Sequence, residues 1–312
     1  NTGLQVGVVD GQQGTTQTGA ATYTIPIKVT PGINGMEPKL AITYSSQNGN
    51  GLLGVGWNLS GLSSITLDNR NIYYDGKTAP INIAPTVSSD GTAFSLDGMR
   101  LIGRSGTYGW AGSTYSTELE NYSLITAQGV ANASCGCPLN FNIKTKDGLS
   151  MDYGDNGSNP DALILSYGNS YPIMWRLKRT TDNNGNYIDY KYSITTDGES
   201  KIDEINYTGN STNNVATPFA KVKFIYSERS DPNIMYVVGS NSTNATTLKS
   251  KWLLDKIIIT SDAQTVKTYK FNYAFDGIYS VLQEVKEIGS DNTELNSTIL
   301  RYGNPKELDA AN

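Results

Sequence analysis

The segment Thr22-Tyr23-Thr24-Ile25-Pro26-Ile27-Lys28-Val29 alternates polar and apolar residues with a period of two. Such alternation is typical of a β-strand with one buried face. A turn-rich stretch, Pro31 to Gly35, follows, and a second alternating run then carries Leu40, Ile42 and Tyr44. The two runs are therefore predicted to pair as a hairpin with an extended loop. Because Pro26 has no backbone N–H, we expect its strand to lie at a sheet edge or to carry a bulge.

The same pattern continues to the C-terminal end of the chain. Alternating runs over 141–145, 188–192, 222–226, 252–260 and 266–273 are separated by Gly-, Asn- and Asp-rich turns such as Asp147-Gly148 and Asn184-Gly185. Asx-Gly pairs between alternating runs favour hairpins. No window shows a sustained period of 3.6 residues, and polar residues 208–217 and 239–249 are predicted to form long surface loops. The predicted fold is all-β, antiparallel and hairpin-rich.

The composition supports this fold class. The 312 residues include 32 Gly and 20 Tyr, with 38% hydrophobic and only 17% charged residues. Good helix formers are scarce, whereas turn formers and aromatic residues that favour strands are common. We expect residues 1–20 to form a loose lead-in and residues 21–312 to form one β domain, divisible into two sub-regions at about 21–165 and 166–312.

Charge and residue usage exclude several classes of function. The chain has no histidine, so it cannot contain a histidine-based catalytic triad or a histidine-ligated metal. Its net charge of −5 disfavours a protein that tracks nucleic-acid phosphates. No run approaches the roughly 20 apolar residues of a transmembrane helix, and no signal peptide is visible. The sequence predicts no enzymatic activity, no catalytic residue, no cofactor and no metal site.

The two cysteines, Cys135 and Cys137, are one residue apart. A disulfide between them would close a very small ring, at the limit of the Cα separations that suit such a bond. We therefore expect two free thiols in a loop rich in Gly and Pro.

Three local motifs are better explained by turns than by ligands. Residues 49–54 match GxGxxG, but no helix is predicted to follow them, so nucleotide binding is not expected. Residues 182–186 place oxygen-bearing side chains like a calcium loop, but Tyr187 stands where that loop needs glycine. The acidic residues Asp152, Asp155 and Asp161 lie among turn formers and are interpreted as a solvated loop.

Residues 19–38 and 44–63 together resemble a known family. They read Gly19-Ala20-Ala21-Thr22-Tyr23-Thr24-Ile25-Pro26-Ile27 with Pro31-Gly32-Ile33-Asn34-Gly35-Met36-Glu37-Pro38, and then Tyr44 to Trp57 with Leu59 to Ser63. This pattern resembles the N-terminal domain family shared by the SpvB virulence protein and the B components of insecticidal Tc toxin complexes, relatives of Rhs/YD-repeat proteins. Fainter likeness continues almost to the C-terminal end. The residues matched to the family are Tyr23, Pro26, Gly32, Gly35, Met36, Tyr44, Gly49, Gly51, Gly54, Gly56, Trp57, Asp97, Gly98, Asp147, Gly148, Asp182, Gly185 and Asn186.

The resemblance implies a non-catalytic structural module of a large secreted bacterial toxin or virulence protein. Its sheets would form a curved part of a β-rich shell that encloses or presents a C-terminal toxic payload. Implied partners are downstream domains of the same polypeptide, namely a β-propeller and Rhs repeats, and other toxin-complex subunits. One departure from the family pattern is that residues 64–68 lack the arginine usually found just after Ser63. The scattered Tyr and Trp residues leave an alternative, a secreted carbohydrate-binding or surface-adhesion module.

Overall fold

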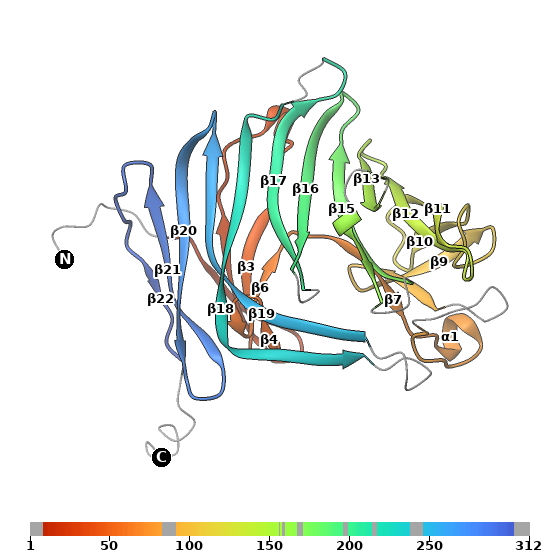
Figure 1. Ribbon diagram of the computed structural model, residues 1–312, viewed down its shortest axis with the longest axis horizontal. Coiled ribbons are helices and arrows are strands. Elements are labelled where there is room, and N and C mark those ends of the chain that lie inside the picture. Colours follow the sequence, from red (N-terminus) through yellow and green to blue (C-terminus); the bar gives the residue numbers. More distant parts are fainter. Residues whose placement is uncertain are drawn as a thin grey trace.

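The computed structural model confirms an all-β chain built from antiparallel strands (Figure 1). The structure describes residues 9–82, 92–155, 157, 160–166, 171–195, 199–213, 217–237 and 246–302, with the backbone alone at 233–237 and 246–249. The short helical turns in this part of the chain are η1 (Ile33–Gly35), α1 (Ile72–Asp75) and η2 (Pro160–Ala162). The strands fall into an N-terminal sheet, a closed ring and a large curved sheet.

The N-terminal sheet has the order β1 (Gln12–Thr15), β2 (Ala21–Ile27), β3 (Leu40–Ser45) and β6 (Trp57–Ser60). The predicted hairpin is confirmed, because β2 pairs with β3 without a register shift from Thr22 to Ile27. Strand β1 covers only residues 21–24 of β2, so Pro26 lies where no partner on that side requires an N–H. Within the predicted lead-in of residues 1–20, residues 12–15 pair with β2 and form strand β1.

The ring is a closed path of eight paired strands. They are β7 (Ser64–Asp68), β8 (Ala93–Leu96), β9 (Met99–Ser105), β10 (Thr114–Thr117), β11 (Leu124–Asn132), β12 (Cys137–Lys144), β13 (Ser150–Gly154) and β15 (Pro172–Thr181). Strand β15 closes the path because it pairs with β7 through residues 174–176 and with β13 through residues 177–181. A short strand, β14 (Leu163–Leu165), also pairs with β15.

Aromatic side chains fill the interior of the ring. The rings of Phe94, Phe141 and Trp175 contact one another at centroid distances of 5.1–5.4 Å with nearly perpendicular planes. Tyr115 packs edge-on against Phe94 at 5.9 Å. All four side chains are buried, and edge-to-face packing of this kind adds stability beyond area burial.

The large sheet continues from β15 as an antiparallel meander (Figure 1, left). Its strands are β16 (Asn186–Ile194), β17 (Ser200–Asn210), β18 (Ala220–Val237), β19 (Thr246–Ser261), β20 (Gln264–Phe275), β21 (Ser280–Gly289) and β22 (Thr298–Ile299). The long strands β18 and β19 bend together, and their bent parts run below β16 and β7 in the view of Figure 1. Their register shifts between Glu228 and Asn233. A bulge at that position accounts for the bend.

Two expected loops are partly wrong. Residues 208–210 end strand β17, and residues 246–249 begin strand β19. Polar composition suggested loops, but cross-strand pairing with β16 and with β18 outweighs it. The remainder of 239–249 and residues 214–216 lie outside the described residues. The division of the chain into sub-regions near residue 165 stays a prediction.

Candidate functional site

The N-terminal sheet packs on the large sheet along a seam whose loop holds four of the family-matched glycines, Gly49, Gly51, Gly54 and Gly56. The seam loop, residues 49–57, contains the two-residue strands β4 (Asn50–Gly51) and β5 (Gly54–Val55). Gly54 has φ +86°, and a Cβ there would lie 2.4 Å from the carbonyl oxygen of Ser280. Gly56 has φ +79°, and a Cβ there would lie 2.4 Å from the ring of Tyr44. Glycine at both positions therefore allows the backbone to approach β21 and β3 closely.

An ion pair from the bulge of β18 fixes this loop. The guanidinium of Arg229 pairs with the carboxylate of Asp231 at 3.1 Å, and both side chains are buried. Arg229 also donates to the carbonyl oxygen of Gly51 at 3.3 Å and to the side-chain oxygen of Asn50. Because every donor and acceptor in this cluster has a partner, the pair satisfies the condition for a buried charge to be tolerated.

Asp231 extends the same network to β21. Its Oδ2 accepts a hydrogen bond of 2.8 Å from the backbone N–H of Ser280, and its Oδ1 accepts one from the hydroxyl of that residue. Asn50 donates to Oδ2 at 2.8 Å. Burial opposes ionisation of this carboxyl, but the hydrogen bonds from Ser280, Arg229 and Asn50 outweigh it and hold its pKa well below its usual range.

Trp57 closes the other end of the loop. Its side chain is 1% exposed, and its Nε1 donates a hydrogen bond of 2.8 Å to the hydroxyl of Tyr302. That hydroxyl in turn donates to the carbonyl oxygen of Leu282 at 2.7 Å. The Tyr44 ring packs against Trp57 at 5.3 Å and against Tyr302 at 6.2 Å. Trp57 thus connects the N-terminal sheet to β21 and to the segment after β22.

The family-matched Asx-Gly pairs occupy hairpin turns. Asp97 and Gly98 have φ of +49° and +82° and join β8 to β9. The Asp97 carboxylate accepts from the hydroxyl of Ser63 at 2.6 Å and from the N–H of Ser64 at 2.8 Å. This turn is therefore fixed to the connection between the N-terminal sheet and the ring. Gly148, with φ +84°, joins β12 to β13, and a Cβ on it would collide with Asn183.

Asp182 organises the turn between β15 and β16. Its Oδ1 accepts from the N–H groups of Asn184 and Asn186 at 2.9 and 2.8 Å. Its Oδ2 accepts from the side-chain amides of Asn186 and Asn34 at 2.8 and 3.1 Å. These hydrogen bonds lower the pKa of Asp182 although partial burial acts to raise it. The residues resembling a calcium loop thus form an Asx turn, and Asn34 connects it to the N-terminal sheet.

The other family-matched residues support the first hairpin. Tyr23 packs edge-on against Trp57 at 6.3 Å. The N–H of Gly32 donates to the Glu37 carboxylate at 2.8 Å, and a Cβ on Gly32 would lie 2.0 Å from the carbonyl oxygen of Met36. Gly35 has φ +74° at the end of η1. The geometry brings Tyr23, Tyr44 and the seam-loop residues together and leaves the Asx-Gly turns of the ring apart from them.

Sequence reasoning missed the residues of the large sheet that complete the seam: Arg229, Asp231, Ser280 and Tyr302. Their residue types are ordinary for exposed strands and hairpin ends. Only the bulge in β18, which the sequence does not signal, turns Arg229 and Asp231 inward.

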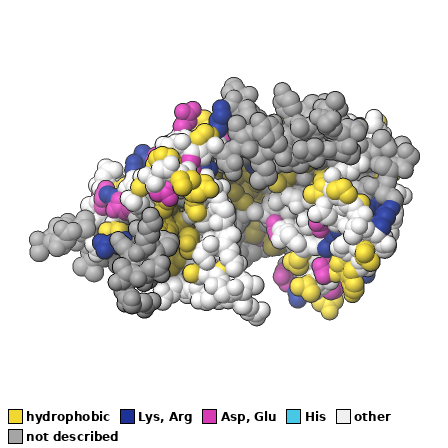
Figure 2. Space-filling view, turned by 90° about the horizontal axis from the view of Figure 1, so that it is seen from below, with side chains coloured by type: hydrophobic (Ala, Val, Ile, Leu, Met, Phe, Trp, Pro, Cys, Tyr) yellow, Lys and Arg dark blue, Asp and Glu magenta, His cyan; other side chains and the backbone are white. Residues whose placement is uncertain are grey.

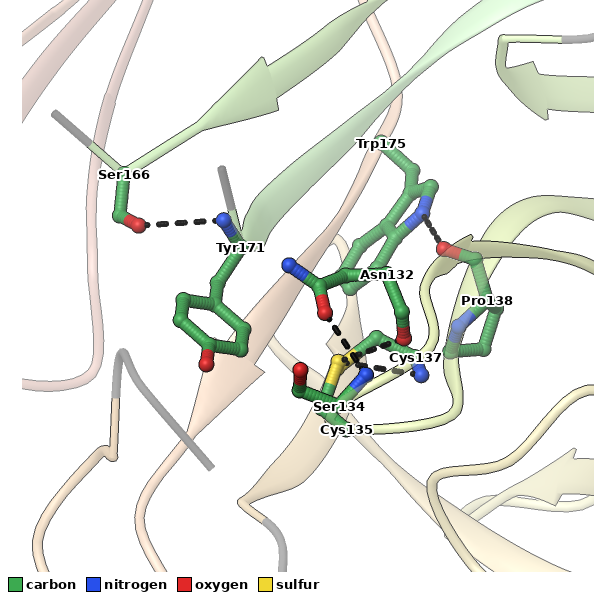
Figure 3. Close-up of a disulfide and its surroundings, with 8 residues drawn as sticks. All are labelled: Asn132, Ser134, Cys135, Cys137, Pro138, Ser166, Tyr171 and Trp175. Carbon is green, nitrogen blue, oxygen red and sulfur yellow. Dashed lines mark hydrogen bonds between the residues drawn. A yellow bond between two sulfur atoms is a disulfide. The ribbon is translucent and has the colours of Figure 1, made fainter. Parts of the chain in front are cut away.

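The expectation of free thiols is wrong, because Cys135 and Cys137 form a disulfide (Figure 3). Gly136 has φ +63°, and this turn conformation places the two Cα atoms 5.1 Å apart, within the range that a disulfide accepts. Both cysteines are buried between β11 and β12. Next to them, the Trp175 indole N–H donates to the carbonyl oxygen of Pro138 at 3.0 Å, as Figure 3 shows.

Within the described ranges, no three Cys, Asp or Glu side chains are grouped so as to hold a metal ion. Residues 49–54 form the seam loop rather than the strand–turn–helix that a dinucleotide-binding motif requires. No helix in the described part of the chain has the length and apolar character needed to cross a bilayer.

Residues 15–72 match the family model described as Salmonella virulence plasmid 65kDa B protein, SpvB. The N-terminal domain of the effector protein SpvB from Salmonella typhimurium strain LT2 has a similar structure, with a TM-score of 0.62 and 17% identity over 85% of this chain and 98% of that chain. These findings confirm the resemblance inferred from the sequence.

Two Tc toxin structures are also similar. A crystal structure of TcdB2-TccC3 without its hypervariable C-terminal region has a TM-score of 0.69 and 17% identity, covering 98% of this chain and 17% of that chain. A Photorhabdus luminescens Tc holotoxin pore has a TM-score of 0.69 and 17% identity, covering 94% of this chain and 16% of that one. This chain therefore spans about a sixth of those proteins, and at this identity the likeness shows a shared fold. Curated proteins yield no match.

Proposed function

We propose that this chain is a non-catalytic structural module of a large secreted bacterial toxin or virulence protein. It forms part of a β-rich shell that encloses or presents a C-terminal toxic payload. The observation that supports this function best is the extent of the fold match: 98% of the chain corresponds to a segment that makes up only 17% of a TcdB2-TccC3 structure. A segment of that share is a portion of a larger assembly rather than a complete toxin.

The internal construction of the chain suits a wall. One hydrogen-bonded path runs from the ring through β15 to β22, so the sheet offers a continuous barrier without an internal edge along that path. The N-terminal sheet covers one face of the large sheet, and the two sheets meet along the seam. For example, the Lys28 N–H donates to the Tyr269 hydroxyl at 3.1 Å and the Tyr207 hydroxyl donates to the Thr30 carbonyl oxygen at 3.0 Å. Among the family-matched residues, Tyr44, Gly54, Gly56 and Trp57 take part in this packing of the two sheets.

The end of the ring offers a surface for neighbouring shell segments. Ile72, Tyr73, Leu119 and Tyr122 are 69%, 85%, 71% and 73% exposed. The nearby Glu118 carboxylate raises the pKa of Tyr74 to about 12, so α1 lies close to the segment that precedes β11. Figure 2 shows hydrophobic side chains gathered with charged ones on this lobe, at the right of the view. The proposed partners are downstream domains, a β-propeller and Rhs repeats, and other toxin-complex subunits.

Hydroxyl-radical footprinting tests the proposal. Tyr73 and Tyr122 should be oxidised readily in the isolated 312-residue chain and protected in the natural gene product, where neighbouring shell segments cover them. Buried Tyr207 is the internal control and should be protected in both samples. Equal oxidation of Tyr73 and Tyr122 in the two samples would contradict the proposal.

A further inference from the structure

Two cavities lie side by side where the seam loop meets the hairpin of β20 and β21. The larger has a volume of about 640 Å³ and the smaller about 450 Å³. Val55 and Tyr279 line both, so the two cavities form one elongated groove divided by these side chains. Volumes of this size are typical of sites for small organic ligands.

Aromatic rings form much of the larger cavity. Tyr44, Phe275, Tyr279 and Tyr302 line it. Phe275, Tyr279 and Tyr302 are 50%, 46% and 42% exposed, which is unusual for three large aromatic side chains that line one cavity. Tyrosine presents a flat apolar face and a polar tip, so this wall can contact a ligand that is apolar on one side and polar at its rim.

Polar side chains that the fold does not use lie in the same cavity. Gln283 and Arg301 line it, and neither side chain has a hydrogen-bond partner among the described residues. The hydroxyls of Tyr44 and Tyr279 are likewise without a partner in that part of the chain. The Tyr302 hydroxyl, in contrast, is engaged with Trp57 and Leu282, which holds its ring in place. The donors and acceptors that remain are accessible to an outside molecule.

The charge of the cavity restricts the ligand further. Asp276 and Arg301 contribute one negative and one positive charge to the larger cavity, and the Asp231 carboxylate, which lines the smaller one, is neutralised by its ion pair with Arg229. Asp276 Oδ1 accepts from the N–H groups of Ile278 and Tyr279 at 2.8 and 2.7 Å, which fixes the turn that carries Tyr279. Opposite charges of equal size favour a ligand without net charge but with many hydroxyl groups, which can both donate and accept.

We infer that this groove, lined by Tyr44, Val55, Asp276, Tyr279, Gln283 and Arg301, binds a short neutral oligosaccharide. A pyranose ring has an apolar C–H face that stacks on tyrosine and a rim of hydroxyls that reaches the carboxylate, amide and guanidinium groups. The division of the groove by Val55 and Tyr279 suits a chain of sugar rings. This site goes beyond the proposed shell function, which depends on the sheets and not on the groove.

A glycan array followed by titration calorimetry on the 312-residue chain tests the inference. The array holds neutral and acidic oligosaccharides, and a proline-rich peptide is titrated separately. Tyr279→Ala and Gln283→Ala should each weaken binding of a neutral oligosaccharide about tenfold. Tyr122→Ala, which removes an exposed tyrosine on the ring, is the matched control and should leave binding unchanged.

Saturable binding of a neutral oligosaccharide that both groove variants weaken would support the inference. Binding of no oligosaccharide, of acidic ones only, or of the peptide instead would overturn it. Binding that neither variant changes would also overturn it, because the ligand would then occupy another surface. None of these results alters the footprinting of Tyr73 and Tyr122, so failure of this inference can be distinguished from failure of the shell function.

Discussion

The indole Nε1 of Trp57 donates a hydrogen bond of 2.8 Å to the hydroxyl of Tyr302, which lies 245 positions further along the chain. One residue belongs to the N-terminal sheet and the other follows the last strand of the large sheet. The first and last parts of the described chain therefore form one packed unit, with the ring inserted between them in sequence.

Loss of Trp57 should destabilise the whole chain. Trp57→Ala removes a fully buried indole and is expected to cost about 3–5 kcal/mol of unfolding free energy. Tyr302→Phe keeps the ring but leaves the indole N–H without its acceptor, so about 1–3 kcal/mol is expected. Urea unfolding measures both values. Tyr122→Phe, at an exposed site, should change the unfolding free energy by no more than about 0.5 kcal/mol. Equal effects of all three substitutions would contradict a stabilising contact between Trp57 and Tyr302.

Gly54 should tolerate alanine less well than a glycine with the same φ in open space. Gly54 and Gly19 have φ of +86° and +84°, but no atom lies within 4 Å of a Cβ placed on Gly19. Both substitutions meet the backbone penalty of about 1–2 kcal/mol for a left-handed residue. Gly54→Ala must in addition displace the Ser280 carbonyl, so thermal unfolding should show it as clearly the less stable variant. A similar loss of thermal stability in both variants would mean that the seam loop does not approach β21 closely.

The Arg229–Asp231 pair should stabilise the chain at neutral pH and less in acid. Arg229→Met leaves the buried Asp231 carboxylate unpaired and should cost about 3–5 kcal/mol at pH 7. Lys191→Met, which removes a surface partner of Glu204, should cost at most about 1 kcal/mol.

The pH dependence follows from the lowered pKa of Asp231. A carboxyl whose pKa is lower in the folded state contributes its full stability above the unfolded pKa, near 3.8, and loses it as the pH falls toward the folded value. The stability difference between the unsubstituted chain and Asp231→Asn should therefore shrink between pH 5 and pH 2. Urea titrations across this range check the sign, and a gap that widens in acid would be inconsistent with the network.

The disulfide should be present in the purified chain. Cys135 and Cys137 should resist alkylation in denaturant until a reductant is added, which mass spectrometry detects directly. Because the closed loop is very short, its loss through Cys135→Ser with Cys137→Ser should cost only about 1–2 kcal/mol. Alkylation of both residues without reduction would show that Cys135 and Cys137 are free thiols.

Local pattern predicted the strands with clear alternation, such as β2, β3, β16 and β20, because alternation and Asx-Gly turns act within a few residues. It gave no prediction for the ring strands β7 to β11, β13 and β15. The hairpin of Ile25 with Ile42 and the aromatic face of Tyr269 and Phe271 are examples. Closure of the ring through β15 could not be predicted, since Ile65 pairs with Trp175 across more than a hundred residues without a local signal. The inward turn of Arg229 depends on a bulge, and the disulfide depends on the positive φ of Gly136, so neither could be read from residue types.

Electron cryomicroscopy of the natural gene product that carries this chain would show whether it belongs to a shell. We expect β15 to β22 to form part of the wall of a hollow β-rich shell, with the end of the ring that carries Tyr73 and Tyr122 covered by neighbouring segments. A map in which the chain forms a separate domain on a flexible tether, with no enclosed volume beside it, would rule out the shell function.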